Sequence, residues 1–352
     1  MLLTTSNQGC LMKKVLMVFL GCLLAFAPTA TSFAADDAIV TLYAARNSEA
    51  DKALYALFEK ETGIKVIVEN GKALELIERI KNEGSATTAD LFFTVDGGVL
   101  HTAKVAGILQ PITSKAVLDN VPSSLRDKDS QWVALASRAR IIVYSKERVK
   151  PEQLSTYEDL ADPKWRGKIV ARPLALYDQS LIASLISLNG EANTLEWVKG
   201  VVANFSRPPK GNDRGQAKDI AAGMADLGLM NTYYIGQMLN SKDAEEVKAA
   251  QQIGVFFPNQ TTTGTHVNVS GIALTSHAKN TENAVKLLEF LTAVPAQEQL
   301  SAQSYEFPVN PKAQAHPLLK SWGTFKAHVI DFPILNTNNA KAIQLMTDGG
   351  WK

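Results

Sequence analysis

Two neighbouring tyrosines, Tyr233 and Tyr234, are the residues of this sequence best placed to do chemistry. They follow the apolar run 227–230, which predicts a buried strand, and they open the helix predicted over residues 235–239. Tyr177 lies at the start of another predicted helix, in the equivalent strand-to-helix position earlier in the chain. Side chains at such turns can converge, and the positive end of the helix dipole favours negative charge there.

Three phenol groups brought together would form a set of hard, anionic oxygen ligands once they lose their protons. Phenol has an unperturbed pKa near ~10, so only a strongly polarising cation deprotonates it at neutral pH. Ferric iron is such a cation, whereas softer or divalent metals prefer thiolate or imidazole. Partly buried tyrosines also pack ordinary protein interiors, with their hydroxyls hydrogen-bonded. The tyrosines alone leave both interpretations open.

Other chemistries find little support in the 352 residues. The sequence has no phosphate loop, dinucleotide fingerprint, zinc-protease motif or nucleophile elbow, so we predict that it is not an enzyme. The five histidines never pair at a metal-ligand spacing, and His266 stands out only because it begins a long β-rich stretch. The 36 basic residues nearly balance the 35 acidic ones, which removes the bias expected of a nucleic-acid binder.

The N-terminal segment has the three parts of a secretory signal peptide. Lys13 and Lys14 form the basic start, residues 15–27 form the apolar middle, and small residues lead up to Ala34. About 13 apolar residues are too few for the ~20 that a membrane-spanning helix needs. We therefore predict a signal peptide over residues 1–34 and an exported protein.

The only two cysteines, Cys10 and Cys22, lie in the predicted signal peptide. The exported body would therefore contain no thiol. Disulfide bridges, thiolate metal sites and cysteine nucleophiles are excluded for it on this ground.

Strand and helix patterns alternate from the start of this body. Short β-rich runs at 39–43, 65–69 and 89–94 are separated by helical patterns, of which the first begins at Ser48 and ends at Gly63. This order predicts parallel strands joined by right-handed crossovers. Such sheets bind ligands beyond the carboxyl ends of their strands.

Two long β-rich stretches, 132–144 and 266–274, interrupt the alternation, which resumes between them. Each stretch leaves one α/β unit and enters another. The pattern therefore predicts an α/β protein of two lobes, each a mixed sheet flanked by helices, joined by a two-stranded hinge. The predicted lobes comprise residues 35–137 with 265–312, and residues 138–264 with 313–352.

Seven segments carry recognisable motifs: 58–66 (FEKETGIKV), 89–91 (ADL), 137–140 (SRAR), 160–167 (LADPKWRG), 231–234 (NTYY), 264–271 (GTHVNVSG) and 305–309 (YEFPV). Together they resemble bacterial periplasmic ferric-iron-binding proteins, above all the cyanobacterial branch of that family. These proteins are the solute receptors of iron ABC importers and have the type II periplasmic binding protein fold. The likeness covers nearly all of residues 37–352.

The resemblance implies a transferrin-like periplasmic receptor that closes on one ferric ion, Fe3+, and docks onto an ABC permease of the inner membrane. Tyr177, Tyr233 and Tyr234 match the three ligand tyrosines of the family. We expect a monomer that binds no nucleic acid. Two alternatives stay open: a receptor of the same fold for an anion or small organic ligand, and an iron-binding protein with a protective or structural role.

The first lobe departs from the family pattern. The cyanobacterial branch usually has Arg-His-Tyr after the first strand, whereas this chain has Arg46, Asn47 and Ser48. Val95 stands where another branch places a glutamate ligand. The first lobe is therefore expected to supply no iron ligand of the usual kind.

Two arginines are candidates for binding an anion beside the iron. Arg46 follows the first strand and Arg138 lies in the first long β-rich stretch, so both could face the cleft. The alternative is that each pairs with a carboxylate such as Asp96. If both are unpaired, a bidentate dianion would neutralise them, and the family resemblance makes carbonate the expected synergistic anion.

Overall fold

Ten strands form the centre of residues 38–352, the part of the chain that the computed structural model describes. Seven of them follow one another in the order β2-β1-β3-β9-β5-β7-β6, and β4, β8 and β10 pair alongside this path. The predicted signal peptide and both cysteines lie outside the described residues. None of the helices within residues 38–352 is long and apolar enough to cross a membrane.

The first three strands and their helices match the predicted alternation. Both β2 and β3 pair with β1 in parallel, as expected. Ser48 caps α1 through its side chain, and Gly63 ends that helix in the left-handed region at φ 72°. The elements are β1 (Ile39–Ala44), α1 (Glu49–Thr62), β2 (Lys65–Asn70), α2 (Ala73–Glu83), β3 (Leu91–Thr94) and α3 (Gly97–Val105).

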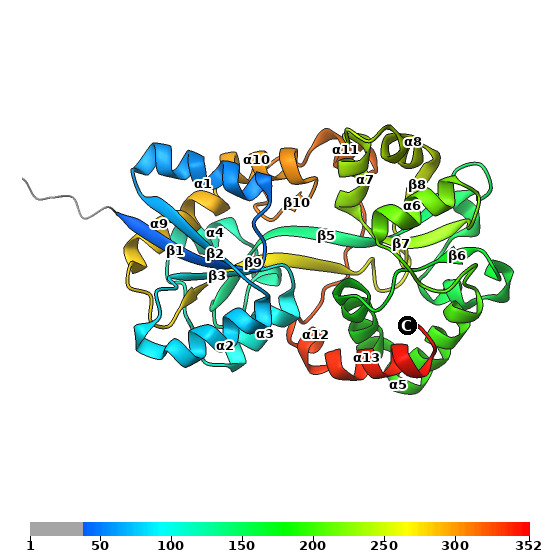
Figure 1. The fold of residues 1–352 in the computed structure, drawn as a ribbon, viewed down its shortest axis with the longest axis horizontal. Coiled ribbons are helices and arrows are strands. Elements are labelled where there is room, and N and C mark those ends of the chain that lie inside the picture. Colours follow the sequence, from blue (N-terminus) through cyan, green and yellow to red (C-terminus); the bar gives the residue numbers. More distant parts are fainter. Residues whose placement is uncertain (1–37) are drawn as a thin grey trace, which may run out of the picture. The chain divides into compact units, whose positions relative to one another are not determined.

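Two long strands, β5 (Trp132–Ser145) and β9 (Val267–Thr275), connect the two groups of strands (Figure 1). The first part of β5 pairs with β9, which continues the sheet to β3. From Arg140 onward, β5 pairs instead with β7 (Leu227–Asn231) and β8 (Ile253–Phe256). The prediction of a two-lobed α/β fold joined by two strands is confirmed.

The tyrosines lie inside helices rather than before them. Helix α7 (Thr232–Leu239) begins directly after β7, three residues earlier than predicted, so Tyr233 and Tyr234 belong to its first turn. Tyr177 is the second residue of α5 (Leu176–Ala203), a little after the short strand β6 (Ile169–Val170). The long α5 contains a non-helical residue, Gly190 at φ 79°, which divides it into two helical segments.

The C-terminal helices contact both lobes. Helix α12 (Pro333–Thr337) packs against α3 of the first lobe and α5 of the second. A Cβ atom on Gly97, the first residue of α3, would come within 2.2 Å of the Phe332 ring, so only glycine fits this contact. The residue boundaries of the two lobes stay a prediction.

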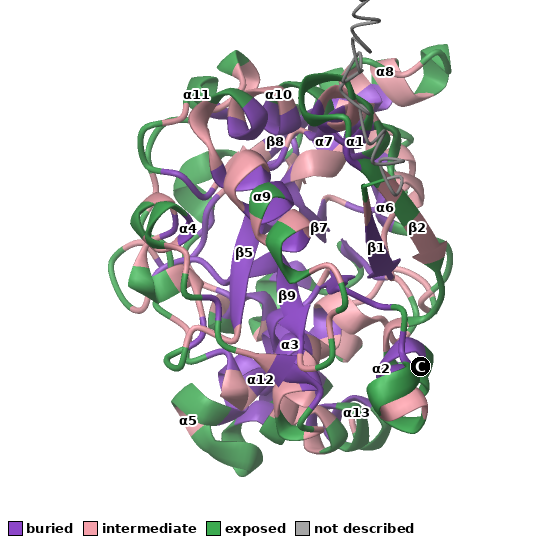
Figure 2. Cartoon of the chain, turned by 90° about the vertical axis from the view of Figure 1, so that its left-hand side faces the viewer, coloured by how far each residue is buried: buried purple, intermediate pink, exposed green. Residues whose placement is uncertain are grey.

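The remaining elements surround these sheets. Figure 2 shows the buried strands β5 and β9 at the centre, with exposed faces on the helices around them. The elements not yet named are β4 (Leu109–Gln110), α4 (Lys115–Asn120), α6 (Asp213–Ala221), α8 (Ala244–Gln252), α9 (Thr281–Thr292), α10 (Val294–Ser304), β10 (Phe307–Pro308), α11 (Pro317–Ser321) and α13 (Asn339–Asp348).

Candidate metal site

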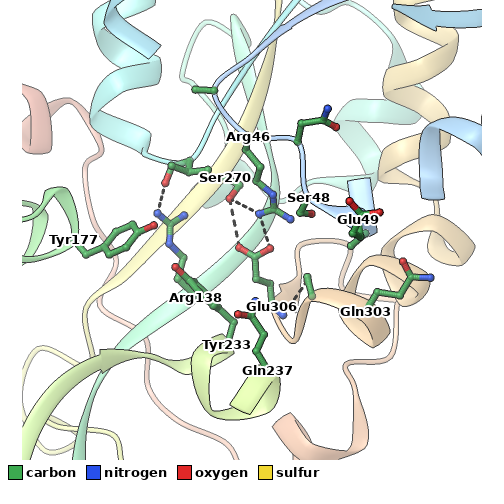
Figure 3. A pocket seen from close by; sticks show the side chains of 15 residues that line it. Arg46, Ser48, Glu49, Arg138, Tyr177, Tyr233, Gln237, Ser270, Gln303 and Glu306 are labelled. Atoms are coloured by element: carbon green, nitrogen blue, oxygen red, sulfur yellow. Dashed lines mark hydrogen bonds and ion pairs between the residues drawn. The ribbon is translucent and has the colours of Figure 1, made fainter. Parts of the chain in front are cut away.

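A pocket of about 570 Å³ lies between the loops that follow β1 and β3 and the first turns of α5 and α7 (Figure 3). Four of the five predicted site residues line it: Arg46, Arg138, Tyr177 and Tyr233. Tyr234 does not line the pocket itself. The pocket therefore forms where the carboxyl ends of strands from both lobes face one another, as the rule for such sheets predicts.

The three tyrosines form one connected group. The rings of Tyr233 and Tyr234 pack with their centroids 4.4 Å apart. Tyr177 and Tyr234 are both close enough to Tyr233 to raise the pKa of its phenol. The Nδ2 of Asn231 donates a hydrogen bond to the Tyr233 hydroxyl, at 3.3 Å. The three phenol groups are thus near neighbours.

The surroundings of Tyr233 and Tyr234 favour the protonated form of both phenols at neutral pH. Burial raises the pKa of Tyr233 well above its usual range, and the neighbouring Tyr177 and Tyr234 raise it further, while Arg138 lowers it. Burial also raises the pKa of Tyr234, with contributions from Tyr177 and Asp213. A cation that binds here must therefore displace the protons.

Within residues 38–352, no carboxylate pairs with Arg138. Its side chain is buried, with 3% of the residue exposed, and its Nη2 donates a hydrogen bond to the carbonyl of Val95. The guanidinium carbon lies 5.9 Å from the centre of the Tyr177 ring. Asp96, the carboxylate suggested above as a partner, instead caps α3 and accepts a hydrogen bond from Asn268. Arg138 therefore brings an unpaired positive charge to the tyrosines.

Arg46 is paired, unlike Arg138. Its Nε lies 2.9 Å from Asp51 and its Nη1 lies 2.6 Å from Glu306. Burial alone would lower the pKa of the Arg46 guanidinium, but these two carboxylates raise it overall. The dianion hypothesis assumed two unpaired guanidinium groups. This assumption is wrong for Arg46, because the structure places two acidic side chains against it.

Glu306 is a pocket residue to which the sequence analysis gave no role. It follows Tyr305, which ends α10 in the left-handed region at φ 60°. The Tyr305 side chain packs closely on α7, and a Cβ atom on Gly236 would clash with it. This turn directs Glu306 towards Arg46 and Ser270 (Figure 3). The motif 305–309 was the available signal, but it does not reveal which residue Glu306 contacts.

Asn47 and Ser48 of the loop after β1 bring neutral polar groups to the pocket, and Glu49, the first residue of α1, brings a carboxylate. The side chain of Ser48 accepts a hydrogen bond from the backbone of Asp51, and the side chain of Asp51 accepts one from the backbone of Ser48. Asp51 also accepts a hydrogen bond from Arg46, so the Asp51 carboxylate fixes this loop. Asn47 lines the pocket with a buried Oδ1 that has no hydrogen-bond partner. Val95 contributes only an apolar side chain and its carbonyl bond to Arg138. That the first lobe supplies no iron ligand of the usual kind stays a prediction.

A buried cluster of ion pairs contacts the residues next to the tyrosines in the chain. Arg140, 2% exposed, binds Asp178 at 2.5 Å and Asp213 at 2.7 Å, and Arg172 also pairs with Asp213. The Nη1 of Arg140 further donates to Asn231, the residue that donates to Tyr233, at 3.4 Å. Two arginines and two aspartates balance in charge. The cluster fixes the starts of α5 and α6 against the middle of β5.

Within residues 38–352, no group of three or more histidine, cysteine, aspartate or glutamate side chains could hold a metal ion. A metal bound in the described part of the chain would therefore need donors besides these four side-chain types. The grouped phenols are hard oxygen donors once deprotonated; the pocket also contains the carboxylates of Glu49 and Glu306, of which Glu306 pairs with Arg46.

Comparison with known proteins agrees with this geometry. The family model described as bacterial extracellular solute-binding protein matches residues 53–327. This chain belongs to that family. Iron uptake protein A1 of Synechocystis sp. is 47% identical to it over 314 residues, which cover 89% of this chain and 87% of that protein. The major ferric iron-binding protein of Neisseria meningitidis is 30% identical over 294 residues, which cover 82% of this chain and 86% of that protein.

Solved structures of relatives share the fold of this solute-binding protein. A Trichodesmium protein in complex with iron and citrate ligands is 46% identical, with a TM-score of 0.85. The match covers 89% of this chain and 100% of that one. The ferric binding protein from Campylobacter jejuni is 40% identical, with a TM-score of 0.83 and coverages of 89% and 100%. The resemblance to periplasmic ferric-binding proteins is thereby confirmed. The family is one of solute receptors rather than of enzymes.

Replacing Asp213 by asparagine should strongly destabilise the fold, because two arginines would then share only Asp178. Breaking a buried ion pair typically costs about 3–5 kcal/mol, since it leaves a desolvated charge without compensation. Urea unfolding of Asp213→Asn should show this loss. The exposed Asp243, which pairs with Lys218, provides the matched control, and Asp243→Asn should leave the midpoint unchanged. Equal midpoints for the two variants would contradict the structural role of the cluster.

Proposed function

We propose that this protein is a periplasmic receptor that binds one ferric ion through the phenolates of Tyr177, Tyr233 and Tyr234. The observation that carries the proposal is the contact among these three phenols beside an unpaired guanidinium, that of Arg138. Three phenolates balance the charge of Fe3+. Hard, anionic oxygen donors also favour the ferric over the ferrous state.

The relatives support the choice of cargo. Those named above include iron uptake and ferric iron-binding proteins, and they cover most of this chain. As in other ABC importers, the loaded receptor would deliver its ion to a permease in the inner membrane. We further propose that the protein acts as an exported monomer and that residues 1–34 are its cleaved signal peptide.

The iron would carry an accompanying anion. Three phenolates leave about three positions open on a six-coordinate ion, and the pocket of about 570 Å³ has room for more than the metal. Asn47, Gln237 and Gln303 line it with neutral polar groups. A relative was solved with iron and citrate ligands. Carbonate or a small carboxylate would complete the coordination here, next to Arg138.

Closure of the lobes would follow metal binding. All three tyrosines lie on α5 and α7, so the ion can bind one lobe first. Residues of the first lobe, including Arg46 and Asn47, would then approach across the pocket. Rotation about β5 and β9 is the motion that the fold allows.

Titration of ferric citrate into the protein should produce a visible phenolate-to-iron charge-transfer band. Replacing Tyr233 and Tyr234 by phenylalanine keeps both rings but removes two anionic oxygens, so the band should disappear and the affinity fall by at least about a hundredfold. Spectroscopic titration of Tyr233→Phe/Tyr234→Phe measures both effects. Tyr144→Phe, which changes a half-buried tyrosine outside the pocket, serves as the control and should bind as the parent does. Full ferric affinity in the double variant would refute the ligand assignment.

Iron affinity should decrease steeply as the pH falls. Because burial raises the pKa of Tyr233 and Tyr234, the phenols are neutral below pH 7, and each phenolate formed must release a proton. Up to three protons leave, so the conditional affinity should change by up to about three orders of magnitude per pH unit. Proton release in weakly buffered solution and affinities at pH 5, 6 and 7 test this. A flat profile would exclude phenolate ligation.

Bicarbonate or citrate should strengthen iron binding, and Arg138 should carry most of the effect. Arg138→Lys replaces a planar fork with a point charge and should weaken the anion's contribution, whereas the apo fold should persist. Arg46→Ala should weaken iron binding less than Arg138→Ala, because Asp51 and Glu306 already neutralise Arg46. Calorimetry with and without bicarbonate measures these differences. Equal affinity in the two buffers would show that no anion takes part.

A further inference from the structure

One contact at the edge of the pocket joins the two lobes directly. Tyr305, at the end of α10, packs against Gly236 in the middle of α7. Helix α10 packs on α1 and α9, and β10, which follows it, pairs with the first part of β5, so Tyr305 lies with the first lobe. Helix α7 packs on α6 and α8 of the second lobe. The contact therefore crosses from one lobe to the other.

The contact is too close for any side chain at position 236. A Cβ atom on Gly236 would lie 2.3 Å from the Cγ of Tyr305 and 2.6 Å from its Cβ. The Cβ of Tyr305 does not move when the side chain rotates, so no rotamer of this tyrosine relieves the overlap. The two backbones would have to separate instead.

Both residues of the contact depart from local conformational preferences. Gly236 lies inside a helix without a left-handed φ, where alanine is the more stable residue. Tyr305 has a φ of 60° at a helix end where glycine is usual, and this region is unfavourable for a bulky side chain. Such departures are typical of functional sites. The close approach of Tyr305 to Gly236 accounts for the glycine inside α7.

The contact lies between two walls of the pocket. On one side, α7 carries the tyrosine pair within one turn of Gly236. On the other side, Glu306 follows Tyr305 directly, and its carboxylate lies 2.6 Å from Arg46. The carbonyl of Glu306 accepts a hydrogen bond from the hydroxyl of Ser301 at 2.8 Å, which ties this turn to α10. The position of Tyr305 on Gly236 therefore sets how far the Arg46–Glu306 pair lies from the tyrosines.

A similar contact lies on the other side of the hinge strands. Phe332 packs against Gly97 of α3 in the first lobe, and the helix that follows it, α12, packs on α5 of the second lobe. In Figure 1, α7 and α10 lie above β5 and β9, whereas α3 and α12 lie below them. An aromatic ring that rests on a glycine does not interlock with a side chain there. Rotation about the line through both contacts would separate neither of them.

We propose that Tyr305 is a positioning residue and that its contact with Gly236 is the pivot of the hinge at the edge of the pocket. The lobes rotate about this pivot, which sets the separation between the tyrosine pair and the Arg46–Glu306 pair. The statement about lobe geometry concerns the iron-free protein. Its consequence for iron rests on the proposed function.

A single methyl group at position 236 tests the pivot without iron. Carbon atoms in contact need about 3.5 Å, so Gly236→Ala forces the two segments at least about 1 Å apart. Spin labels on the exposed Lys60→Cys of α1 and Lys248→Cys of α8, in a chain with Cys10→Ser and Cys22→Ser, report this separation by pulsed EPR. The label distance should lengthen while the Tm changes little, because the lobes yield by rotating. An unchanged distance, or the loss of Tm that an overpacked core gives, would overturn the proposal.

Two further variants identify the cause of the shift. A Cβ atom on Gly215, another glycine inside a helix, would meet only the Oδ1 of Asn212, 3.7 Å away, so Gly215→Ala should keep the parent's label distance. In Gly236→Ala/Tyr305→Gly the glycine changes sides. The second substitution removes the clashing atoms and suits a φ of 60°, so the label distance should return to that of the parent. A shift that persists in this double variant would show that it arises within α7 and would refute the role of Tyr305.

Iron binding should report the same displacement. If Gly236→Ala makes the closed form tenfold less populated, the apparent ferric affinity falls about tenfold. Competition with a chelator measures this loss, and Gly215→Ala again serves as the control. Equal affinities of the parent and Gly236→Ala would refute the positioning role. A parent protein that binds no iron would refute the ferric proposal instead, and the label distances would still decide on the pivot.

Discussion

The burial of two arginines on one strand constrains everything around the pocket. Arg138 and Arg140 sit in the middle of β5, the strand that pairs with β9 on one side of this point and with β7 and β8 on the other. Charges at this depth require partners, because desolvation is expensive. Asp178 and Asp213 supply them for Arg140, and in doing so they fix the first turns of α5 and α6. The tyrosines are positioned by the same contacts, since Tyr177 precedes Asp178 and Asn231 links Arg140 to Tyr233.

The two arginines show how a binding site is kept apart from a structural cluster. Arg140 is fully compensated and can therefore serve as a rigid support. Arg138, two residues away on the same face of the strand, donates a hydrogen bond to a backbone carbonyl and lies beside the Tyr177 ring, and no ion pair within residues 38–352 neutralises its charge. A strand that alternates its faces places both residues on one side, while their different partners give them different roles.

The fold could be predicted well from the sequence, because strand and helix periodicities and the caps at Ser48 and Gly63 are local signals. The position of Tyr177 and Tyr233 could be predicted for the same reason. The pairing of Arg46 could not, since Glu306 is 260 residues away in the chain and reaches it only through the left-handed turn at Tyr305. Long-range ion pairs of this kind leave no periodic trace in a single sequence.

The charges on the two sides of the pocket differ in sign. Arg46, Asp51 and Glu306 together carry one negative charge, whereas Arg138 carries one positive charge beside the tyrosines. An anion that accompanies a cation into this pocket is therefore attracted to the Arg138 side and repelled from the Glu306 side. The ferric ion, held by phenolates near Arg138, would bind its anion in the position where that attraction is strongest. Under the proposed function, the first lobe would influence the anion through the net charge of Arg46, Asp51 and Glu306, which requires no side chain of that lobe on the metal.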